Sequence, residues 1–424
     1  MSLHVVVIGA GIVGAAAALE LLRDGHRITI IEPGEPGGEQ AASYGNGAWL
    51  SPASVVPMSM PGTWKKVPGY LADPLGPLTI RISALPRLLP WLARFLYAGA
   101  TVARVEATAR ALSALLSDAP ARHRQLAVEA GVPELIRQDG LLYVYPDRQS
   151  FDAEALSWRL RRDNGVRWSE LTGEQLRARE PALDPRYQLG ILVDAGAHCT
   201  DPGAYVAALV RHAVSRGATL VRSRATGFDV TSGRLRAVLT DSGRIECDRA
   251  VIAAGIRSRP LARAAGDKVS LESERGYHVV VADPESAPRT PVMPSDGKMA
   301  NTMTSRGLRA SGQVELADVD AAPNWKRARI LLDHLRHTYP GLPDRIPEQR
   351  LATWMGHRPS TPDGLPAIGP ASACSDVVHA FGHGHVGLAA APATASLVAD
   401  IIAGRSPSIP LQPYSAARFR LWSS

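Results

Sequence analysis

Three glycines near the start of the chain have the spacing that a dinucleotide phosphate requires, in the run Gly9-Ala10-Gly11-Ile12-Val13-Gly14. Gly9 allows a tight turn, and Gly11 has no side chain, so a pyrophosphate can approach the backbone. Gly14 lets the following helix pack closely on the preceding strand. The first N–H groups of that helix would offer hydrogen bonds and a partial positive charge to the phosphates. This spacing therefore predicts a nucleotide-phosphate site.

The residues around these glycines predict the βαβ unit that must position them. A β-branched apolar run, residues 5–8, leads into the glycines, an alanine-rich helical pattern follows, and a second apolar strand spans residues 28–31. That strand ends on Glu32, whose carboxylate can accept hydrogen bonds from ribose hydroxyls. Strand, helix, second strand and terminal acid together predict nucleotide binding, but they do not distinguish FAD from NAD.

Two later segments favour a flavin nucleotide. Residues 251–255 predict a buried strand that ends on small residues, so the backbone of Ala254 and Gly255 could approach the nucleotide. A second glycine-rich turn precedes a small-residue helix at 388–402 and predicts a second anion site at its N-terminus. The residues of this turn are Gly382, His383, Gly384, His385, Val386 and Gly387. The chain has no second complete GxGxxG run, so a separate NAD domain is not evident.

Composition narrows the class of protein. The chain has 424 residues, 45% of them hydrophobic and 21% charged, as in globular proteins with one large two-lobed fold or two to three domains. The net charge of +7 is scattered and is not interleaved with aromatic residues, which argues against nucleic-acid binding. The cysteines Cys199, Cys247 and Cys374 are too widely spaced for a disulfide framework or a CxxC metal site, so we expect no metal.

The sequence also predicts a cytoplasmic protein. The first strand begins so early that a signal peptide has no room, and no apolar run is judged long enough to span a bilayer. Residues 85–100 form an apolar stretch interrupted by proline and arginine, for which the favoured interpretation is an amphipathic helix packed on the core. The alternative is a surface element that docks on a partner or on the inner face of the cell membrane, so membrane contact is expected to be at most peripheral.

Taken together, the motifs resemble the FAD-dependent D-amino-acid oxidase superfamily, and most closely the D-amino-acid dehydrogenase type. The resemblance covers most of the chain, and the motifs occur in the order of the family. It rests on GAGIVG at 9–14, Glu32, ASYGNGAWLSP at 42–52, HCTDPGAYVAAL at 198–209, VIAAGIRS at 251–258, RGYH at 275–278, WMGHRPSTPDGLPAIGP at 354–370 and FGHGHVGL at 381–388.

The order of the elements predicts two interleaved lobes. The resemblance implies an α/β fold in which a Rossmann-like FAD-binding lobe alternates with an α+β substrate-binding lobe, as in D-amino-acid oxidase and glutathione reductase. We expect residues 1–65, 151–265 and 351–424 to form the FAD-binding lobe. Residues 66–150, mainly helical, and 266–350, a sheet plus a helix, would form the substrate lobe.

The family comparison also implies which residues contact a non-covalent FAD. Ser43, Asn46 and Gly47 would line the turn that passes the flavin, while Thr226, with the backbone at 254–255, would contact the adenine side. The turn at 382–387 would lie along the isoalloxazine ring, with the N-terminus of its helix facing the edge that becomes negative on reduction. Fixed dipoles at that position would stabilise the developing charge.

A smaller set of residues is expected to carry the reaction. An amino-acid substrate brings a carboxylate, which the planar fork of an arginine pairs well, and the resemblance places Arg358 there. Tyr277 would give that carboxylate a second hydrogen bond. His278 and His385 would orient the substrate amine or a ring hydroxyl, and a polar residue in the position of His357 would suit a hydroxylated substrate.

The expected reaction is dehydrogenation of a D-amino acid, with D-proline and D-hydroxyproline as candidate substrates. Hydride would pass from the α carbon to N5 of FAD, and the electrons would leave to a quinone or a carrier protein. One alternative is a glycine- or sarcosine-type oxidase that uses oxygen. A second is a non-catalytic flavoprotein subunit of a larger dehydrogenase, against which Arg358 and Tyr277 argue.

Overall fold

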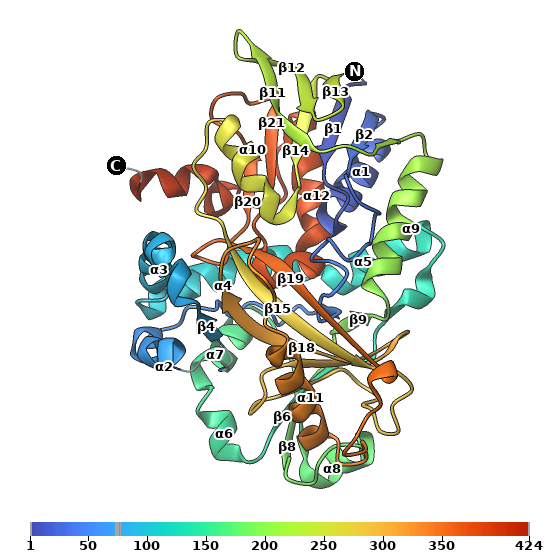
Figure 1. Cartoon of the computed structure of the whole chain (residues 1–424), viewed down its shortest axis with the longest axis vertical. Coiled ribbons are helices and arrows are strands. Elements are labelled where there is room, and N and C mark those ends of the chain that lie inside the picture. The colour runs from blue at the N-terminus through green and yellow to red at the C-terminus, as the bar shows by residue number, and fades with distance from the viewer. Residues whose placement is uncertain (1, 73–75, 77, 423–424) are drawn as a thin grey trace.

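The computed structural model describes residues 2–72, 76 and 78–422, which form two lobes around two large sheets (Figure 1). The sheet of the first lobe has six strands in the order β10-β2-β1-β14-β21-β20, and only β20 is antiparallel to its neighbour. These strands are β1 (His4–Ile8), β2 (Arg27–Ile31), β10 (Thr219–Val221), β14 (Arg249–Ile252), β20 (Ala367–Pro370) and β21 (Val377–Phe381). The strand order places the carboxyl ends of β1, β2 and β14 side by side, where an α/β sheet binds nucleotides.

Close packing of small residues holds two helices on this sheet. Helix α1 (Ile12–Arg23) buries Ala15–Ala18 completely, and α12 (Gly387–Ala403) packs against it with its own alanine-rich face. Because alanine side chains are short, the two helix axes can approach each other while α1 covers β1 and β21 and α12 covers β20 and β21. The strand–helix–strand unit predicted for residues 5–32 is confirmed, with bounds that differ by at most one residue.

The sheet of the second lobe crosses the lower half of the molecule (Figure 1). Its main path runs β19-β15-β18-β17-β16-β6-β8-β7, and β4 adds to β18. These strands are β4 (Leu78–Ile80), β6 (Leu141–Tyr145), β7 (Ser169–Thr172), β8 (Leu189–Val193), β15 (Glu272–Val281), β16 (Val292–Pro294), β17 (Ala300–Thr304), β18 (Gly307–Leu316) and β19 (Leu351–Ser360). Helix α11 (Lys326–Thr338) buries Leu331 and Leu335 against one face of this sheet.

Two three-stranded sheets and a set of helices complete the fold. The hairpin sheet is β11 (Ala225–Thr231), β12 (Arg234–Thr240) and β13 (Gly243–Glu246), and the other comprises β3 (Trp49–Leu50), β9 (Ala197–Cys199) and β5 (Ile136–Arg137). The remaining α-helices are α2 (Val67–Ala72), α3 (Leu85–Ala98), α4 (Val102–Leu116), α5 (Ala119–Glu129), α6 (Arg148–Asp152), α7 (Ala155–Asp163), α8 (Gly173–Arg179), α9 (Pro202–Ser215) and α10 (Ser258–Ala264).

Strand pairing differs from the expected lobe boundaries at two places. Strands β7 and β8 belong to the sheet of the second lobe because β8 pairs with β6, although residues 151–265 were expected in the first lobe. Strand β19 also pairs with β15 in the second lobe, although the first lobe was expected to resume at residue 351. This long strand was not predicted because it contains a glycine and a proline, which are typical of turns and loops.

One apolar segment corrects the expectation about membrane-spanning length. Residues Gly384–Ala403 are long and apolar enough to cross a bilayer by length and composition. In the structure 72% of the apolar window is buried within the protein, where α12 contacts α1, α4 and α5. A helix that is apolar all round and buried in this way is typical of the core of a large fold.

Candidate active site

The turn between β1 and α1 has the backbone geometry that the glycines predict. Gly9 has φ +107°, and a Cβ at this position would lie 2.5 Å from the carbonyl oxygen of Ala253. A Cβ on Gly14 would lie 1.9 Å from the carbonyl oxygen of Gly9. Side chains at these two positions would therefore push β1, α1 and the segment after β14 apart. The segment that includes Ala254 and Gly255 lies directly beside the turn.

Space remains above this turn, as a phosphate site needs. A Cβ on Gly11 would meet only Ser43 Oγ, at 3.6 Å, and that hydroxyl accepts a hydrogen bond from the N–H of Ile12 at 3.1 Å. The carboxylate of Glu32 accepts from the N–H groups of Ala10 (2.9 Å) and Gly34 (3.0 Å), so Glu32 braces the turn. The residues present therefore fit the diphosphate part of FAD, while the ribose contact of Glu32 stays a prediction.

The loop at residues 43–47 is fixed between the two lobes. Asn46 Oδ1 accepts from the N–H of Ala48 at 2.8 Å, and the carbonyl of Gly47 accepts from Thr302 Oγ1 at 3.0 Å. Arg309, on β18, donates to the carbonyls of Tyr44 (3.3 Å) and Asn46 (3.0 Å). Burial lowers the pKa of Arg309 to about 10, so its guanidinium remains charged at neutral pH. The sequence analysis missed Arg309, because no motif marks it.

Alternation along β15 and β19 separates two faces of the second sheet. On β15, Glu274, Gly276 and His278 point to one face, and their partners Arg358, Gly356 and Trp354 on β19 share it. His278 and Glu274 contact the loop at 43–47 and the turn before α12, so this face looks toward the first lobe. We call it the inner face. The opposite side, with Arg275, Tyr277 and His357, is the outer face and is covered in part by α11.

Arg358 lies on the inner face, and its predicted contact with a substrate carboxylate stays a prediction. Its Nη1 donates to the carbonyl of Gln313 at 3.0 Å and its Nη2 to that of Gly312 at 3.5 Å. The guanidinium occupies the space above Gly276, where a Cβ would lie 2.3 Å from its Cζ. Burial lowers the pKa of Arg358, and the charge of Glu274 opposes that shift. Arg358 lies deep in the protein yet remains partly accessible.

Glu274 is the acidic member of the site, and the sequence analysis did not identify it. It is 4% exposed, and its Oε2 lies 2.6 Å from Nε2 of His385 in the turn before α12. Burial acts to raise the pKa of Glu274, but the charge and hydrogen bond of His385 and the charge of Arg358 outweigh it, so this pKa lies below its ordinary value. His385 and Arg358 thus come together around a buried carboxylate.

His278 continues the inner face beyond Arg358. Its ring lies 5.2 Å from that of Trp354 in a stacked arrangement, and its Nδ1 donates to the carbonyl of Gly45 at 3.2 Å. Burial, followed by the charge of Arg309, lowers the pKa of His278 to about 3, so the ring is neutral and Nε2 is left as an acceptor. A cavity of about 110 Å³ adjoins it. The polar residues that line this cavity are Tyr44, His278, Arg306, Arg309, Gln349 and Arg350.

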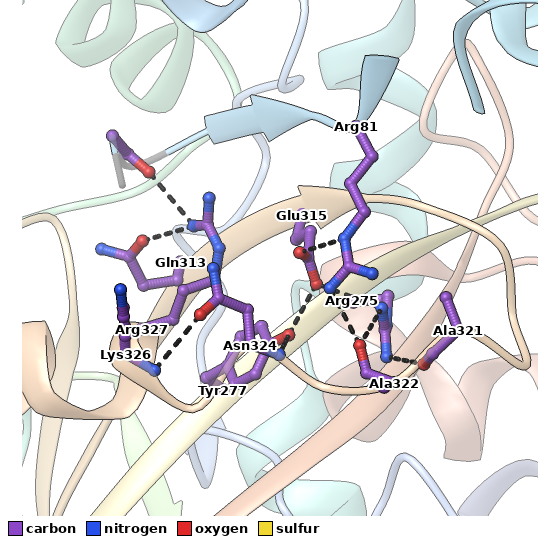
Figure 2. Close-up of polar contacts among 11 residues, drawn as sticks. Arg81, Arg275, Tyr277, Gln313, Glu315, Ala321, Ala322, Asn324, Lys326 and Arg327 are labelled. Atoms are coloured by element: carbon purple, nitrogen blue, oxygen red, sulfur yellow. Dashed lines mark hydrogen bonds and ion pairs between the residues drawn. The ribbon is translucent and has the colours of Figure 1, made fainter. Parts of the chain in front are cut away.

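The structure contradicts the expected role of Tyr277. Its side chain points to the outer face and is 1% exposed, and Figure 2 shows its hydroxyl within a polar cluster on that side. The hydroxyl donates to Oε2 of Glu315 at 2.6 Å and accepts from the N–H of Asn324 at 3.0 Å. Arg275 pairs with the same carboxylate at 3.2 Å. Tyr277 cannot reach a carboxylate held by Arg358, because successive side chains on a strand point to opposite faces.

Two further histidines serve internal contacts. The ring of His383 turns into α12, where Nε2 lies 2.9 Å from Thr394 Oγ1, and burial lowers its pKa to about 3. His383 can therefore approach a flavin only through its backbone. His357 points to the outer face and bonds Ser273 Oγ at 2.8 Å, so it does not add polarity to the inner face. Thr226 lies exposed at an irregular position of β11, and its adenine contact stays a prediction.

Comparisons with known proteins agree with this geometry. A model of the family described as DAO, FAD dependent oxidoreductase, matches residues 4–401. The D-amino-acid oxidase of Bradyrhizobium diazoefficiens is 57% identical over 416 residues, which cover 98% of this chain and 99% of that protein. The D-amino acid dehydrogenase 2 of Ralstonia nicotianae is 31% identical over 430 residues, covering 98% of this chain and all (100%) of that protein. The crystal structure of glycine oxidase from Geobacillus kaustophilus has the same fold, with a TM-score of 0.72, 22% identity and coverage of 98% and 99%.

Proposed function

This chain belongs to the DAO family of FAD-dependent oxidoreductases, and from that premise we propose that it oxidises a D-amino acid at the α carbon. The D-configuration is supported by the names of the two relatives, an oxidase and a dehydrogenase of D-amino acids. Bound FAD supplies the two-electron acceptor for the hydride of the α carbon. The protein must therefore hold the substrate, orient it and take up a proton.

The observation that carries this proposal is the placement of Arg358. Its guanidinium is deep and partly accessible, and its two hydrogen bonds go to the main-chain carbonyls of Gln313 and Gly312. Among the residues that the structure describes, no carboxylate oxygen lies within 4.0 Å of its nitrogens. A guanidinium in such a site is stabilised by a ligand carboxylate that it can bind with two parallel hydrogen bonds.

The pair of Glu274 and His385 meets a second requirement of the reaction, which is that the protein takes up a proton. The ammonium of an amino acid must lose a proton before the α carbon can release a hydride. The carboxylate of Glu274, which lies on the same face as Arg358 and 2.6 Å from His385, would accept that proton from a bound substrate. The substrate would then lie between Arg358 at its carboxylate and the Glu274–His385 pair at its amine.

We propose D-proline or D-hydroxyproline as the substrate within this class. The support is the polar character of the inner face, where the neutral His278 and the accessible His385 could bond a ring hydroxyl. For the electron acceptor we propose a quinone or a carrier protein reached from the cytoplasm. The alternative acceptor is oxygen, which the name of the 57% identical relative supports.

Anaerobic bleaching of the flavin tests the proposal. The purified yellow protein is mixed with a panel of D- and L-amino acids, both hydroxyproline epimers, glycine and sarcosine, and absorbance near the flavin maximum is followed. D-amino acids should bleach the flavin, D-proline or D-hydroxyproline fastest. Bleaching by L-amino acids alone would contradict the stereochemistry, and bleaching by none would favour a non-catalytic flavoprotein. Adding oxygen or a soluble quinone to the bleached protein then compares the two acceptors.

A further inference from the structure

The first turn of α12 lacks one of its helical hydrogen bonds. In an α-helix the carbonyl of Leu388 would accept from the N–H of residue 392. That residue is Pro392, which lies inside α12 and has no N–H. Leu388 and Pro392 are both buried, so water cannot take the place of the missing donor. A buried carbonyl without a donor costs about 1–3 kcal/mol, so some other group must fill this position.

His123, on α5, provides that donor. Its Nε2 lies 2.8 Å from the carbonyl oxygen of Leu388, and its side chain is fully buried at 0% exposure. A carbonyl oxygen can only accept, so Nε2 must carry the proton. His123 thus reaches from the helical part of the chain into the first turn of α12 and supplies the bond that Pro392 cannot form.

Tyr205, on α9, fixes the state of this ring. Its hydroxyl lies 3.0 Å from Nδ1 of His123. Burial lowers the pKa of His123 to about 4, so the imidazole is neutral at pH 7 and carries a single ring proton. Since Nε2 holds that proton, Nδ1 is an acceptor. The hydroxyl of Tyr205 donates to it at 3.0 Å, the shorter of its two contacts with His123, the other being the main-chain carbonyl at 3.3 Å. The three helices α5, α9 and α12 therefore meet in one directed chain of hydrogen bonds.

We propose that His123 is a positioning residue, which replaces the helical hydrogen bond removed by Pro392 and so holds the first turn of α12 in place for the flavin. His385, Val386 and Gly387 immediately precede Leu388, so a shift of this turn would move the groups that are expected to face the isoalloxazine ring and Glu274. The link to the flavin rests on the proposed function, whereas the hydrogen bond itself does not.

A second helix offers a matched control within the same chain. In α3, Pro90 stands at the sixth helical residue and the carbonyl that it leaves without a donor belongs to Pro86, the second. Leu388 and Pro392 hold the same second and sixth positions in α12. Pro86 and Pro90 are both exposed, so water can serve that carbonyl and no side-chain donor is required. Pro90→Ala is therefore the neutral counterpart of Pro392→Ala.

The first experiment measures amide hydrogen exchange in the peptide that spans residues 384–396. In His123→Phe the amides of this peptide should exchange about tenfold faster than in wild type. The double variant His123→Phe/Pro392→Ala should regain the protection of wild type, because an alanine N–H can donate to Leu388, whereas His123→Phe/Pro90→Ala should not. Unchanged protection in His123→Phe, or loss that Pro392→Ala does not restore, would overturn the proposal. If His123→Phe is insoluble, recovery of soluble protein with Pro392→Ala but not with Pro90→Ala supports it, and failure of both overturns it.

The second experiment measures the affinity for FAD and the midpoint potential of the bound flavin in wild type, His123→Phe and the two double variants. His123→Phe should bind FAD about tenfold more weakly, and the midpoint potential of the bound flavin should become more negative, because a displaced helix N-terminus stabilises the reduced flavin less. Pro392→Ala should reverse both changes. If exchange behaves as predicted while the affinity and the potential do not move, the positioning role is refuted although the hydrogen bond stands. If no amino acid bleaches the wild-type flavin, the proposed function fails and the exchange result is unaffected.

Discussion

The inner and outer faces of β15 and β19 both carry buried charged side chains, but the partners of these side chains differ between the two faces. On the outer face, Arg275 and Glu315 are 0% and 1% exposed and pair with each other. Glu315 also binds Arg81 and the Tyr277 hydroxyl, and Arg275 also donates to two main-chain carbonyls (Figure 2). On the inner face, Arg358 is bonded only to carbonyls, and Glu274 pairs with a histidine from the other lobe.

This difference separates structural charge from charge that is arranged for a ligand. A buried ion pair whose charges already face charged and polar partners within the fold stabilises the fold only while it remains intact, and removing one partner is costly. A cation whose partners are neutral carbonyls still gains from an added anion. Substitutions on the outer face should therefore change stability, and those on the inner face should change turnover.

The largest expected effect comes from removing the two arginines. Arg358→Met should lower kcat/KM for the D-amino acid by about 10³-fold while FAD content and unfolding temperature stay near wild type, because a charged ligand contact is lost. Arg275→Met should instead destabilise the fold by about 1–3 kcal/mol, since it removes one of the two arginines that pair with the buried Glu315 and leaves only Arg81, at 2.8 Å, as its cationic partner. Steady-state kinetics and thermal unfolding of both variants check this contrast, and the reverse assignment of the two losses would refute it.

Glu274→Gln should have the next largest effect. The ionised carboxylate is lost, so kcat at neutral pH should fall by about 10²-fold. Because the pKa of Glu274 is held below its ordinary value, the wild-type group is ionised throughout the neutral and alkaline range. The deficit should shrink as pH rises, since the substrate then arrives with its amine already neutral. A pH–rate profile in which the deficit is constant would argue against a proton-accepting role.

Gly276→Ala tests the inner face without removing any charge, because it only displaces the guanidinium of Arg358. The new methyl group would lie 2.3 Å from the Cζ of Arg358, so the guanidinium must move and kcat/KM should fall by about tenfold. Gly312→Ala, on the neighbouring strand, serves as the control, because its methyl group would face Leu331 and Met299 at 3.1 Å. The control should lose stability rather than turnover, and equal loss of turnover in both variants would contradict the account.

Tyr277→Phe should affect stability alone. The change removes a buried hydroxyl from Glu315 and from the N–H of Asn324, for an expected loss of about 1–2 kcal/mol in the free energy of unfolding. Turnover should stay within about twofold of wild type, because the hydroxyl points away from the inner face. A marked rise in KM for the amino acid would restore the role that the sequence first suggested for Tyr277.

The smallest expected effect is a dependence of stability on pH. Burial lowers the pKa of His278 and of His383 to about 3, against an ordinary value of 6.5. Between pH 6.5 and 3 the unfolded chain binds protons that the folded chain does not, so stability is full above pH 6.5 and falls as pH decreases. Denaturation at pH 7.5, 6 and 5 should show little loss above pH 6.5 and, between pH 6 and 5, a slope that approaches about 1.4 kcal/mol per pH unit for each such histidine, and His278→Asn should reduce that slope.

The cofactor half of the molecule could be predicted closely from the sequence. Residues 5–32 form the expected strand, helix and strand because the alternation of apolar residues and the glycine spacing are local signals. The turn before α12 was found for the same reason. These elements need no knowledge of their partners to be recognised.

The substrate half depends on pairings that local patterns do not show. Tyr277 was expected on the same face as Arg358 because the RGYH motif alone does not show how its strand pairs with β19. Glu274 carries no motif, although it lies two residues from Gly276 and four from His278, and alternation along one strand would have placed all three on one face. The bond from His123 to Leu388 joins residues 265 apart, and its one local signal is the proline inside the last helix.

The central claim is that Arg358 binds the substrate carboxylate. Its most direct test compares, in anaerobic stopped-flow reduction, the D-amino acid that bleaches the flavin fastest with the corresponding amide, which has no negative charge. The flavin of the wild-type protein should be reduced about 10²-fold or more faster by the acid than by the amide. The flavin of Arg358→Met should be reduced slowly and at similar rates by both. If Arg358→Met keeps the full preference for the acid, then another group holds the carboxylate and the account is contradicted.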